Sequence, residues 1–410
     1  MRPPPSPDPS QAPAAEPPGP LLTNPAFLAL WGGQVASQLA DRMAFVLLVA
    51  LVTRHDPSPG TLGVAIAVTS APTVLLGALA GAWADRLDAR RAMVLSVVAR
   101  AGLVVALGLL GPSHLAVAVG LATLVAVAGQ PFVPAEAAAV PLVVPRLQLL
   151  AANAVSSLST VGALVAGLLV GEPLVQAVGP GLAAVGVAAA FGLAALCLRR
   201  VTYTEPAVTA SLDEPYLVQL REGLAYIRRR GGLRRTMACQ VAIVCTFAAA
   251  SVLAIVLART GLDVPYTWLM AAAGLGLGLG AWVVGRWGAR WGADAAIAGG
   301  FVGCGAALVG LAAVGPGHAG AAFTLAAALG AGGAIVGVPL QTRLQERVAD
   351  GVRGKVFGVQ TTLLNAMAIV PLAGSGHAVE AFGLPAVLAG LGVFAALAGA
   401  AAWGGRLREG

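Results

Sequence analysis

The sequence predicts an all-α membrane protein with twelve transmembrane helices in two pseudo-symmetric six-helix bundles. Hydrophobic residues make up 58% of the 410-residue chain and charged residues only 10%, whereas soluble domains carry about 25% charged residues. Twelve apolar stretches each approach the roughly 20 residues that one bilayer-spanning helix requires. Gly81-Ala82-Trp83 recurs as Gly280-Ala281-Trp282, which indicates two related halves, as in many transporter folds.

The predicted spans fall into two sets of six. The first set lies at 27–53, 61–84, 91–111, 115–137, 148–171 and 175–198, and the second at 234–258, 265–285, 294–314, 319–341, 354–376 and 381–404. The chain then divides into a proline-rich tail that we expect to be disordered (1–22), a first bundle (23–198), a cytoplasmic linker (199–233) and a second bundle (234–405).

The arginines give the predicted spans a direction. With both termini in the cytoplasm, the outer loops hold only Arg54 and Arg259, and nearly all other cationic residues of the spanning region lie on the inner side. This asymmetry follows the positive-inside rule. We therefore expect a multi-pass protein of the bacterial plasma membrane.

The linker contains one amphipathic segment. Asp213 can cap a helix that has Pro215 in its first turn, and its apolar side chains share one face: Leu217, Leu220, Leu224 and Ile227. Arginines cluster at its C-terminal end, where their positive charge interacts favourably with the helix dipole. We expect this helix to lie on the cytoplasmic leaflet.

Several classes of function are excluded by what the sequence lacks. The net charge of +7 is spread over short connections and forms no single basic face for nucleic acid. The four cysteines form no C-x-x-C pair, and no phosphate-binding G-x-x-x-x-G-K-[ST] or H-E-x-x-H motif occurs. We expect no metal, no cofactor and no enzymatic activity, so a gradient or a separate protein must supply the energy.

Asp41 is the sharpest candidate for function, because an ionisable group near the middle of a span is costly unless it faces protein or water. Gln34, Gln38 and Phe45 share its helical face, which we expect to line a central cavity. The hypothesis is that Asp41 binds a proton or a cationic part of the substrate. The alternative is a buried Asp–Arg network with Arg42 and another polar group. Arg42 itself favours an anionic substrate.

Other polar residues at helical spacing can complete this cavity: Asn153, Ser157, Thr160, Gln240, Thr361 and Asn365. Each is equally compatible with hydrogen bonds between helices, which are worth about 0.6 kcal/mol in membranes. Glu136 is a further carboxylate within a span, and we expect Arg100 as its partner.

The stretch from Gly81 to Arg91, GAWADRLDARR, resembles the G-x-x-x-D-R-x-G-R-R loop of the major facilitator superfamily. Three other stretches resemble the branch of enterobactin exporters and macrolide-efflux permeases: 134–154, 220–224 and 353–357. The sequence departs from the loop pattern at Asp88, where glycine is expected, and at Ala89, where the first arginine is expected.

This resemblance implies the major facilitator fold and a cytoplasmic gate. In such a gate Asp85 contacts the helix start around Arg353 and Gly354, since a carboxylate is stabilised near a helix N-terminus. The residues implied in the gate are Gly81, Asp85, Arg86, Arg90, Arg91, Arg353 and Gly354. For the arginines, simple positive-inside anchoring is the alternative explanation.

Together these features predict a monomeric secondary transporter that moves a small molecule through the lipid bilayer by alternating access. The family resemblance implies proton-coupled export. Two alternatives use the same fold, namely a carrier of lysophospholipid or another lipid, and a membrane sensor without solute flux. The sequence does not identify the substrate.

Overall fold

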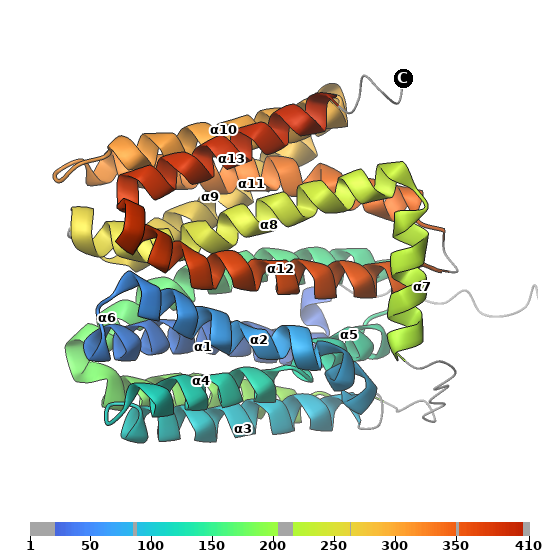
Figure 1. Cartoon of the computed structure of the whole chain (residues 1–410). Helices are drawn as coiled ribbons and strands as arrows, with labels where there is room; N and C mark the ends of the chain where they lie inside the picture. Colours follow the sequence, from blue (N-terminus) through green and yellow to red (C-terminus); the bar gives the residue numbers. More distant parts are fainter. Residues whose placement is uncertain (1–20, 85–87, 204–215, 263, 350–351, 405–410) are drawn as a thin grey trace, which may run out of the picture.

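The computed structural model describes residues 21–84, 88–203, 216–262, 264–349 and 352–404, and these residues are almost entirely helical (Figure 1). The helices of the first half are α1 (Pro25–His55), α2 (Pro59–Ala84), α3 (Ala89–Leu110), α4 (Leu115–Gly129), α5 (Phe132–Val143) and α6 (Leu149–Arg199). After α7 (Tyr216–Arg228), the second half contains α8 (Gly231–Leu257), η4 (Ala258–Leu262), α9 (Tyr266–Trp287), α10 (Ala293–Ala313), α11 (Ala319–Arg347), α12 (Arg353–Phe382) and α13 (Leu384–Gly404).

The helices account for the predicted crossings of the membrane. Ten helical segments among the described residues are long and apolar enough to span, and α2 adds a shorter apolar stretch. One of the ten, Ala151–Arg199, is long enough for two crossings. Within it the chain turns at Gly179, whose φ of 76° is open to glycine without strain. The predicted all-α membrane fold is therefore confirmed.

The boundaries differ from the prediction in two places. The fourth span is broken after Gly129, and Pro131 precedes the new helix α5, because proline cannot donate the backbone hydrogen bond that would continue α4. The fifth and sixth spans are two helices within α6 that meet at Gly179, where the backbone is not helical, and not at the predicted residues 172–174.

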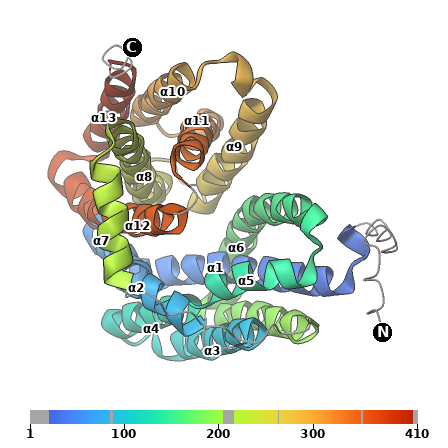
Figure 2. The same ribbon diagram turned by 90° about the vertical axis from the view of Figure 1, so that its right-hand side faces the viewer.

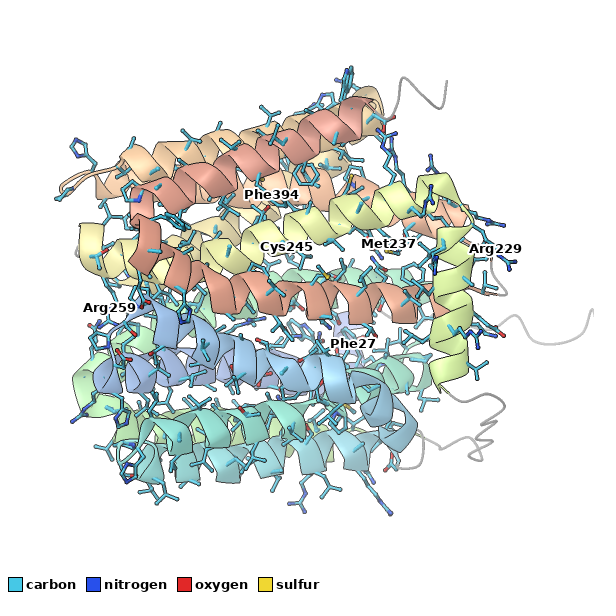
Figure 3. The ribbon with its side chains drawn as sticks, in the orientation of Figure 1. Phe27, Arg229, Met237, Cys245, Arg259 and Phe394 are labelled. Atoms are coloured by element: carbon cyan, nitrogen blue, oxygen red, sulfur yellow. The ribbon has the colours of Figure 1, made fainter. Side chains whose placement is uncertain are left out.

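Two groups of roughly parallel helices make up the molecule: α1–α6 lie together in one group and α8–α13 in the other (Figure 1). Helix α7 crosses one end of the molecule, hereafter the α7 end, and the opposite end is hereafter the distal end. Figure 2 views the molecule from the α7 end. Arg229 marks the α7 end and Arg259 the distal end in Figure 3.

Helix α7 packs on protein through one part of its predicted apolar face, while Leu224 of that face is 44% exposed, so a position on the lipid leaflet stays a prediction. Ile227 is 5% exposed and belongs to a small apolar cluster formed with α8, α11 and α12 residues: Leu233, Met237, Leu344, Val348, Val356 and Val359. Gly223 lets the helix approach α12, since a Cβ there would lie 2.5 Å from the Lys355 carbonyl oxygen. The predicted cap Asp213 and Pro215 lie outside the described residues.

Glycines bring α9 and α11 into backbone contact in the second bundle. A Cβ on Gly276 would lie 1.9 Å from the Ala327 carbonyl oxygen, and one on Gly330 would lie 1.9 Å from the Ala273 carbonyl oxygen. Small residues at a helix interface permit this close approach. In lipid, where the hydrophobic effect does not drive helices together, the resulting van der Waals packing stabilises the pair. These glycines serve packing and belong to no dinucleotide-binding motif.

We predict that Gly276→Ala lowers stability by about 1–3 kcal/mol, because the backbone of α11 cannot yield as a flexible side chain would. Gly278→Ala on the same helix is the matched control, since its Cβ would lie 3.7 Å from the nearest atom, a side-chain carbon of Val161. That change should be neutral or stabilising by up to about 1 kcal/mol. Thermal unfolding of both purified variants decides the matter, and equal effects would contradict the packing account.

Candidate functional site

An ion pair joins α1 to α3 in the interior of the first bundle. Nη1 of Arg100 lies 2.8 Å from Oδ1 and 2.9 Å from Oδ2 of Asp41, and Nη2 donates to the Ser37 hydroxyl at 3.0 Å. The Arg100 side chain is 3% exposed, whereas the Asp41 side chain is 44% exposed. The pair thus buries its cation and leaves its carboxylate open.

The surroundings of Arg100 are built for a cation. Its guanidinium carbon lies 5.1 Å from the ring centre of Phe132 and 4.8 Å from that of Phe191, and aromatic faces attract cations at this distance. Nε also donates to the Ser96 carbonyl at 3.4 Å. Arg100 lies on the buried face of α3. The other buried residues of this helix recur at helical spacing: Ala92, Met93, Ser96, Val97, Val104, Leu107 and Gly108.

These contacts revise two expected partnerships. The alternative for Asp41 was a network with Arg42 and another polar group, but the arginine that pairs with Asp41 is Arg100. Adjacent residues of a helix point about 100° apart, which agrees with Arg42 standing apart from this pair. Glu136 was the expected partner of Arg100. Within the described part of the chain, neither Arg42 nor Glu136 makes an ion pair or side-chain hydrogen bond. The functional and structural hypotheses for Asp41 both remain predictions.

Asp41 opens into a cavity of about 360 Å³ between α1, α2, α3 and α4, hereafter the N-bundle cavity. Its polar lining comes from four helices: Asp41, Arg42, Thr69, Ser70, Thr73, Arg100 and Gln130. Gln130 donates to the Thr73 hydroxyl at 3.3 Å. The cavity therefore offers hydroxyl, amide and charged groups to a ligand.

A second cavity, of about 350 Å³, lies between the two bundles and is hereafter the interbundle cavity. Arg42 is its one charged residue and Ser251 its one hydroxyl; the other described lining residues are apolar or glycine, contributed by α1, α6 and α8–α13 except α12. Arg42 and Phe45 also line the N-bundle cavity. These two side chains stand where the polar and apolar cavities meet.

The remaining residues expected to line the cavity fall in different surroundings. Asn153, Ser157 and Thr361 are exposed and Asn365 is half-buried, while Gln34 and Gln240 are 5% exposed. The Oε1 atoms of Gln38 and Gln240 are buried without a hydrogen-bond partner among the described residues. None of these seven side chains lines either cavity, so a cavity-lining role for them stays a prediction.

Gln240 belongs to a cluster that sequence reasoning missed. Gln341 Oε1 accepts from Gln240 at 3.3 Å and from Gln360 at 2.8 Å. The three residues come from α8, α11 and α12, toward the ends of these helices near α7. Only tertiary structure brings them together, and the cluster ties three helices of the second bundle to one another.

The loop after α2 bears the predicted gate, and its described part is held by Asp88. Asp88 caps α3 by accepting from the Arg90 amide at 3.0 Å, and it lies 3.8 Å from Arg90 Nε and 3.9 Å from Arg91 Nε. The Tyr203 hydroxyl also donates to Asp88. The departure from glycine thus supplies a helix cap and an anchor to the chain after α6.

The other gate residues are only partly described. Gly81 lies in the last turns of α2, Arg353 begins α12 and exposed Gly354 follows it. Asp85 and Arg86 lie outside the described residues. A contact between Asp85 and the start of α12 therefore stays a prediction.

Two of the sequence stretches that resemble transporters touch each other. Lys355 on α12 donates to Glu222 Oε2 on α7 at 2.6 Å, next to the close approach of Gly223. The segments 220–224 and 353–357 therefore form one contact at the α7 end. This contact holds the linker helix to the second bundle.

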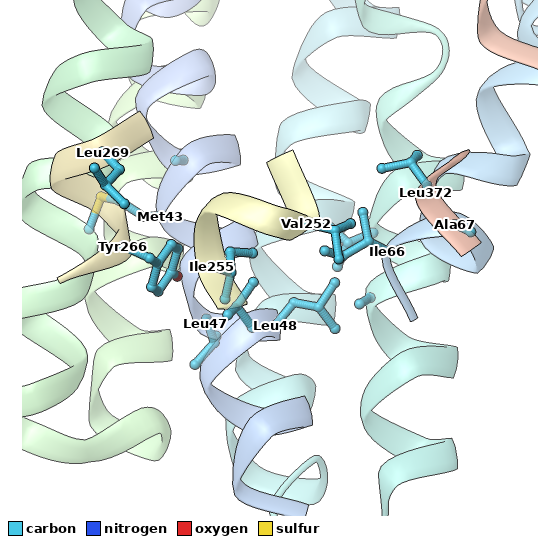
Figure 4. Packing of buried hydrophobic residues seen from close by; sticks show 14 of the residues in the cluster. Met43, Leu47, Leu48, Ile66, Ala67, Val252, Ile255, Tyr266, Leu269 and Leu372 are labelled. Carbon is cyan, nitrogen blue, oxygen red and sulfur yellow. The ribbon is translucent and has the colours of Figure 1, made fainter. Parts of the chain in front are cut away.

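The distal half of the bundle interface is closed by apolar packing (Figure 4). Leu47 and Leu48 of α1 and Ile66 of α2 meet Val252 and Ile255 of α8, and each of these side chains is at most 5% exposed. Nearby, a Cβ on Gly376 of α12 would lie 1.9 Å from the carbonyl oxygen of Pro59 at the start of α2. The bundles are thus in contact at side-chain and backbone level.

Two carboxylates reinforce this closure, each reaching from one bundle to a helix N-terminus of the other. Glu380 on α12 accepts from the amide of Gly60, the second residue of α2, at 2.8 Å. Glu172 on α6 accepts from the amide of Thr267, the second residue of α9, at 3.3 Å, and also from the Thr267 hydroxyl. A helix N-terminus favours negative charge.

This arrangement of two helical groups around central cavities agrees with the comparison with known families. The family model described as Major Facilitator Superfamily matches residues 30–371. The chain belongs to the major facilitator superfamily. Superfamily members are membrane transporters, so the chain is a transporter by family and not a member of an enzyme family. The comparison with curated protein sequences found no match.

Solved structures of other transporters share the superfamily fold. A mutant of the nucleoside transporter NupG superposes with a TM-score of 0.76 at 11% identity, covering 92% of this chain and 98% of that one. A POT family transporter in complex with 5-aminolevulinic acid gives 0.69 at 13% identity, covering 90% and 94%. A bacterial homologue of the human lysosomal transporter Spinster, inward-facing and unoccupied, gives 0.69 at 16% identity, covering 94% and 97%. At these identities the likeness concerns fold alone.

Proposed function

We propose that this superfamily member is a secondary active transporter that exports a small molecule by alternating access, driven by proton entry. One observation carries the proposal: an ion pair in the membrane interior whose carboxylate, Asp41, is 44% exposed to a cavity. Ionisable groups at this depth are rare and typically mark substrate or proton pathways.

The pair gives a physical reason for coupling. A proton on Asp41 would leave the buried Arg100 with only the Ser37 hydroxyl, the Ser96 carbonyl and two aromatic rings as partners. Stranding a buried charge costs several kcal/mol. We therefore expect protonation of Asp41 to accompany movement of α1 against α3, and release of the proton to restore the pair.

Closure at the distal end supports alternating access. The apolar contacts of Figure 4 join the two bundles at the distal end, so opening of that end requires the bundles to separate there. Rocking of two packed bodies about a central site is the usual motion of transporters built from two repeats. The proposed direction, export, rests on the resemblance of three segments to the efflux branch: 134–154, 220–224 and 353–357.

The proposal is tested by flux measurements in proteoliposomes with an imposed pH gradient. The panel of labelled solutes contains siderophores, macrolides, organic cations and lysolipids. We predict that the gradient drives at least one solute uphill, and that Asp41→Asn lowers this driven flux at least tenfold while exchange without a gradient persists.

Asp294→Asn is the matched control, because Asp294 pairs with Arg343 at 2.6 Å between α10 and α11, away from both cavities. It should retain driven flux. Full pH-driven transport by Asp41→Asn would contradict the coupling role. Absence of flux under every gradient would favour a membrane sensor on the same fold.

A further inference from the structure

The charges around the two cavities do not balance. Arg100 takes both carboxylate oxygens of Asp41, which neutralises that pair. Arg42 is exposed at the junction of the cavities and has no ion-pair partner among the described residues. One guanidinium charge therefore remains without a counter-charge where a ligand would sit.

The lining around this charge differs from one side to the other. Toward the second bundle, the interbundle cavity offers leucine, alanine and phenylalanine side chains, which bind apolar surface through the hydrophobic effect. Toward the first bundle, the hydroxyls of Thr69, Ser70 and Thr73 lie in the same cavity as Arg42. Volumes of about 350 and 360 Å³ are at the lower end of small-molecule sites.

We propose that the cargo is an amphiphilic anion, whose apolar body occupies the interbundle cavity and whose anionic group binds Arg42. This inference rests on the proposed transport function and names the substrate class of the same site. Guanidinium groups bind carboxylate and phosphate oxygens through paired N–H donors. The hydroxyls of Thr69 and Ser70 donate to carbonyls of their own helix, whereas the Thr73 hydroxyl accepts from Gln130 and can donate to a further ligand oxygen. A cationic amphiphile would meet Arg42 with like charge, which selects against it.

The test uses three probes that share one alkyl chain: octyl phosphate, octyltrimethylammonium and octanol. Their binding to the full-length protein is measured calorimetrically in nanodiscs of neutral lipid, with empty nanodiscs subtracted. We expect octyl phosphate to bind at least tenfold more tightly than octyltrimethylammonium. Arg42→Gln should abolish this preference, and Arg42→Lys should keep most of it.

Two further variants separate the charge from the apolar site. Arg199→Gln removes a guanidinium at the exposed end of α6 and should leave the preference unchanged. Ala254→Phe, which fills part of the interbundle cavity, should weaken all three probes by a similar factor. An anion preference that survives Arg42→Gln, or a preference for the cation, would overturn the proposal. No gradient is present, so the result is independent of the flux assay.

A second inference rests on the two carboxylates at the distal end. Their contacts are reciprocal: Glu172 of the first bundle meets the second residue of α9, and Glu380 of the second bundle meets the second residue of α2. Both helices are the second spans of their halves. Gly60 is buried and Thr267 is 0% exposed. Each glutamate therefore accepts from a backbone amide that water does not reach.

We infer that Glu172 and Glu380 form a symmetric distal latch, which must release both helix N-termini before that end opens. Glu172 lines a distal cavity together with Arg54, Arg259 and Tyr266. Glu380 and His377 lie side by side next to Gly60, since a Cβ on Gly60 would contact both side chains. An unsatisfied buried amide costs about 1–3 kcal/mol, so each contact stabilises the closed distal end.

Hydrogen–deuterium exchange of the full chain in nanodiscs tests the latch, with Glu172→Ala and Glu380→Ala compared with wild type, because alanine removes the accepting oxygens. A local cap would affect exchange only at its own helix start. A shared latch predicts that either variant raises exchange at least severalfold at both 59–64 and 266–271, because opening frees both segments. Glu346→Ala, at the exposed opposite end of α11, should change neither segment. Purely local effects, or no effect, would overturn the inference.

Discussion

The buried guanidinium of Arg100 is the constraint on which the first bundle depends. A cation 3% exposed inside a membrane bundle must find a counter-charge, hydrogen-bond acceptors and polarisable neighbours in the surrounding helices. Asp41, Ser96, Phe132 and Phe191 meet this need from α1, α3, α5 and α6. The relative position of these helices is therefore tied to a single side chain, and any movement of α1 must either keep or break that pair.

The same pairing determines what the cavities can bind. Because Arg100 neutralises Asp41, the charge that a ligand meets is that of Arg42, one residue further along α1. Phe45 stands one turn beyond, at the same junction of a polar and an apolar cavity. The site thus combines a satisfied pair, which can respond to a proton, with an unsatisfied cation, which can respond to cargo. Alternating access then requires the distal interface to separate, against apolar packing and two carboxylate contacts.

Much of the fold could be predicted from the sequence, because lipid imposes a simple rule on length and polarity. The apolar stretches and the resemblance of residues 81–91 were sufficient for the superfamily fold. Helical spacing also placed Asp41 and Phe45 on one face, and both line the N-bundle cavity. Spacing within one helix says nothing about which other helix lies opposite, and so the partner of Asp41, 59 residues away on α3, was not found.

A signal for that partner was nonetheless present. Asp41 and Arg100 are opposite charges near the middles of their spans, and an unpaired charge at that depth is costly. Glu172 and Glu380 were missed for a different reason. Each lies near the end of a span, where a carboxylate is ordinarily solvated, and only tertiary structure brings a helix N-terminus to it. Periodicity and motifs thus could not predict the side-chain contacts between segments that are distant in the sequence.

The central claim, that Arg100 and not Arg42 is the charge balanced by Asp41, is tested most directly by thermal unfolding of three variants in detergent. The account predicts that Asp41→Asn lowers stability by about 3–5 kcal/mol, since it strands a buried cation. Adding Arg100→Gln should restore part of this loss, whereas adding Arg42→Gln should restore none. Restoration by Arg42→Gln and not by Arg100→Gln would contradict the account.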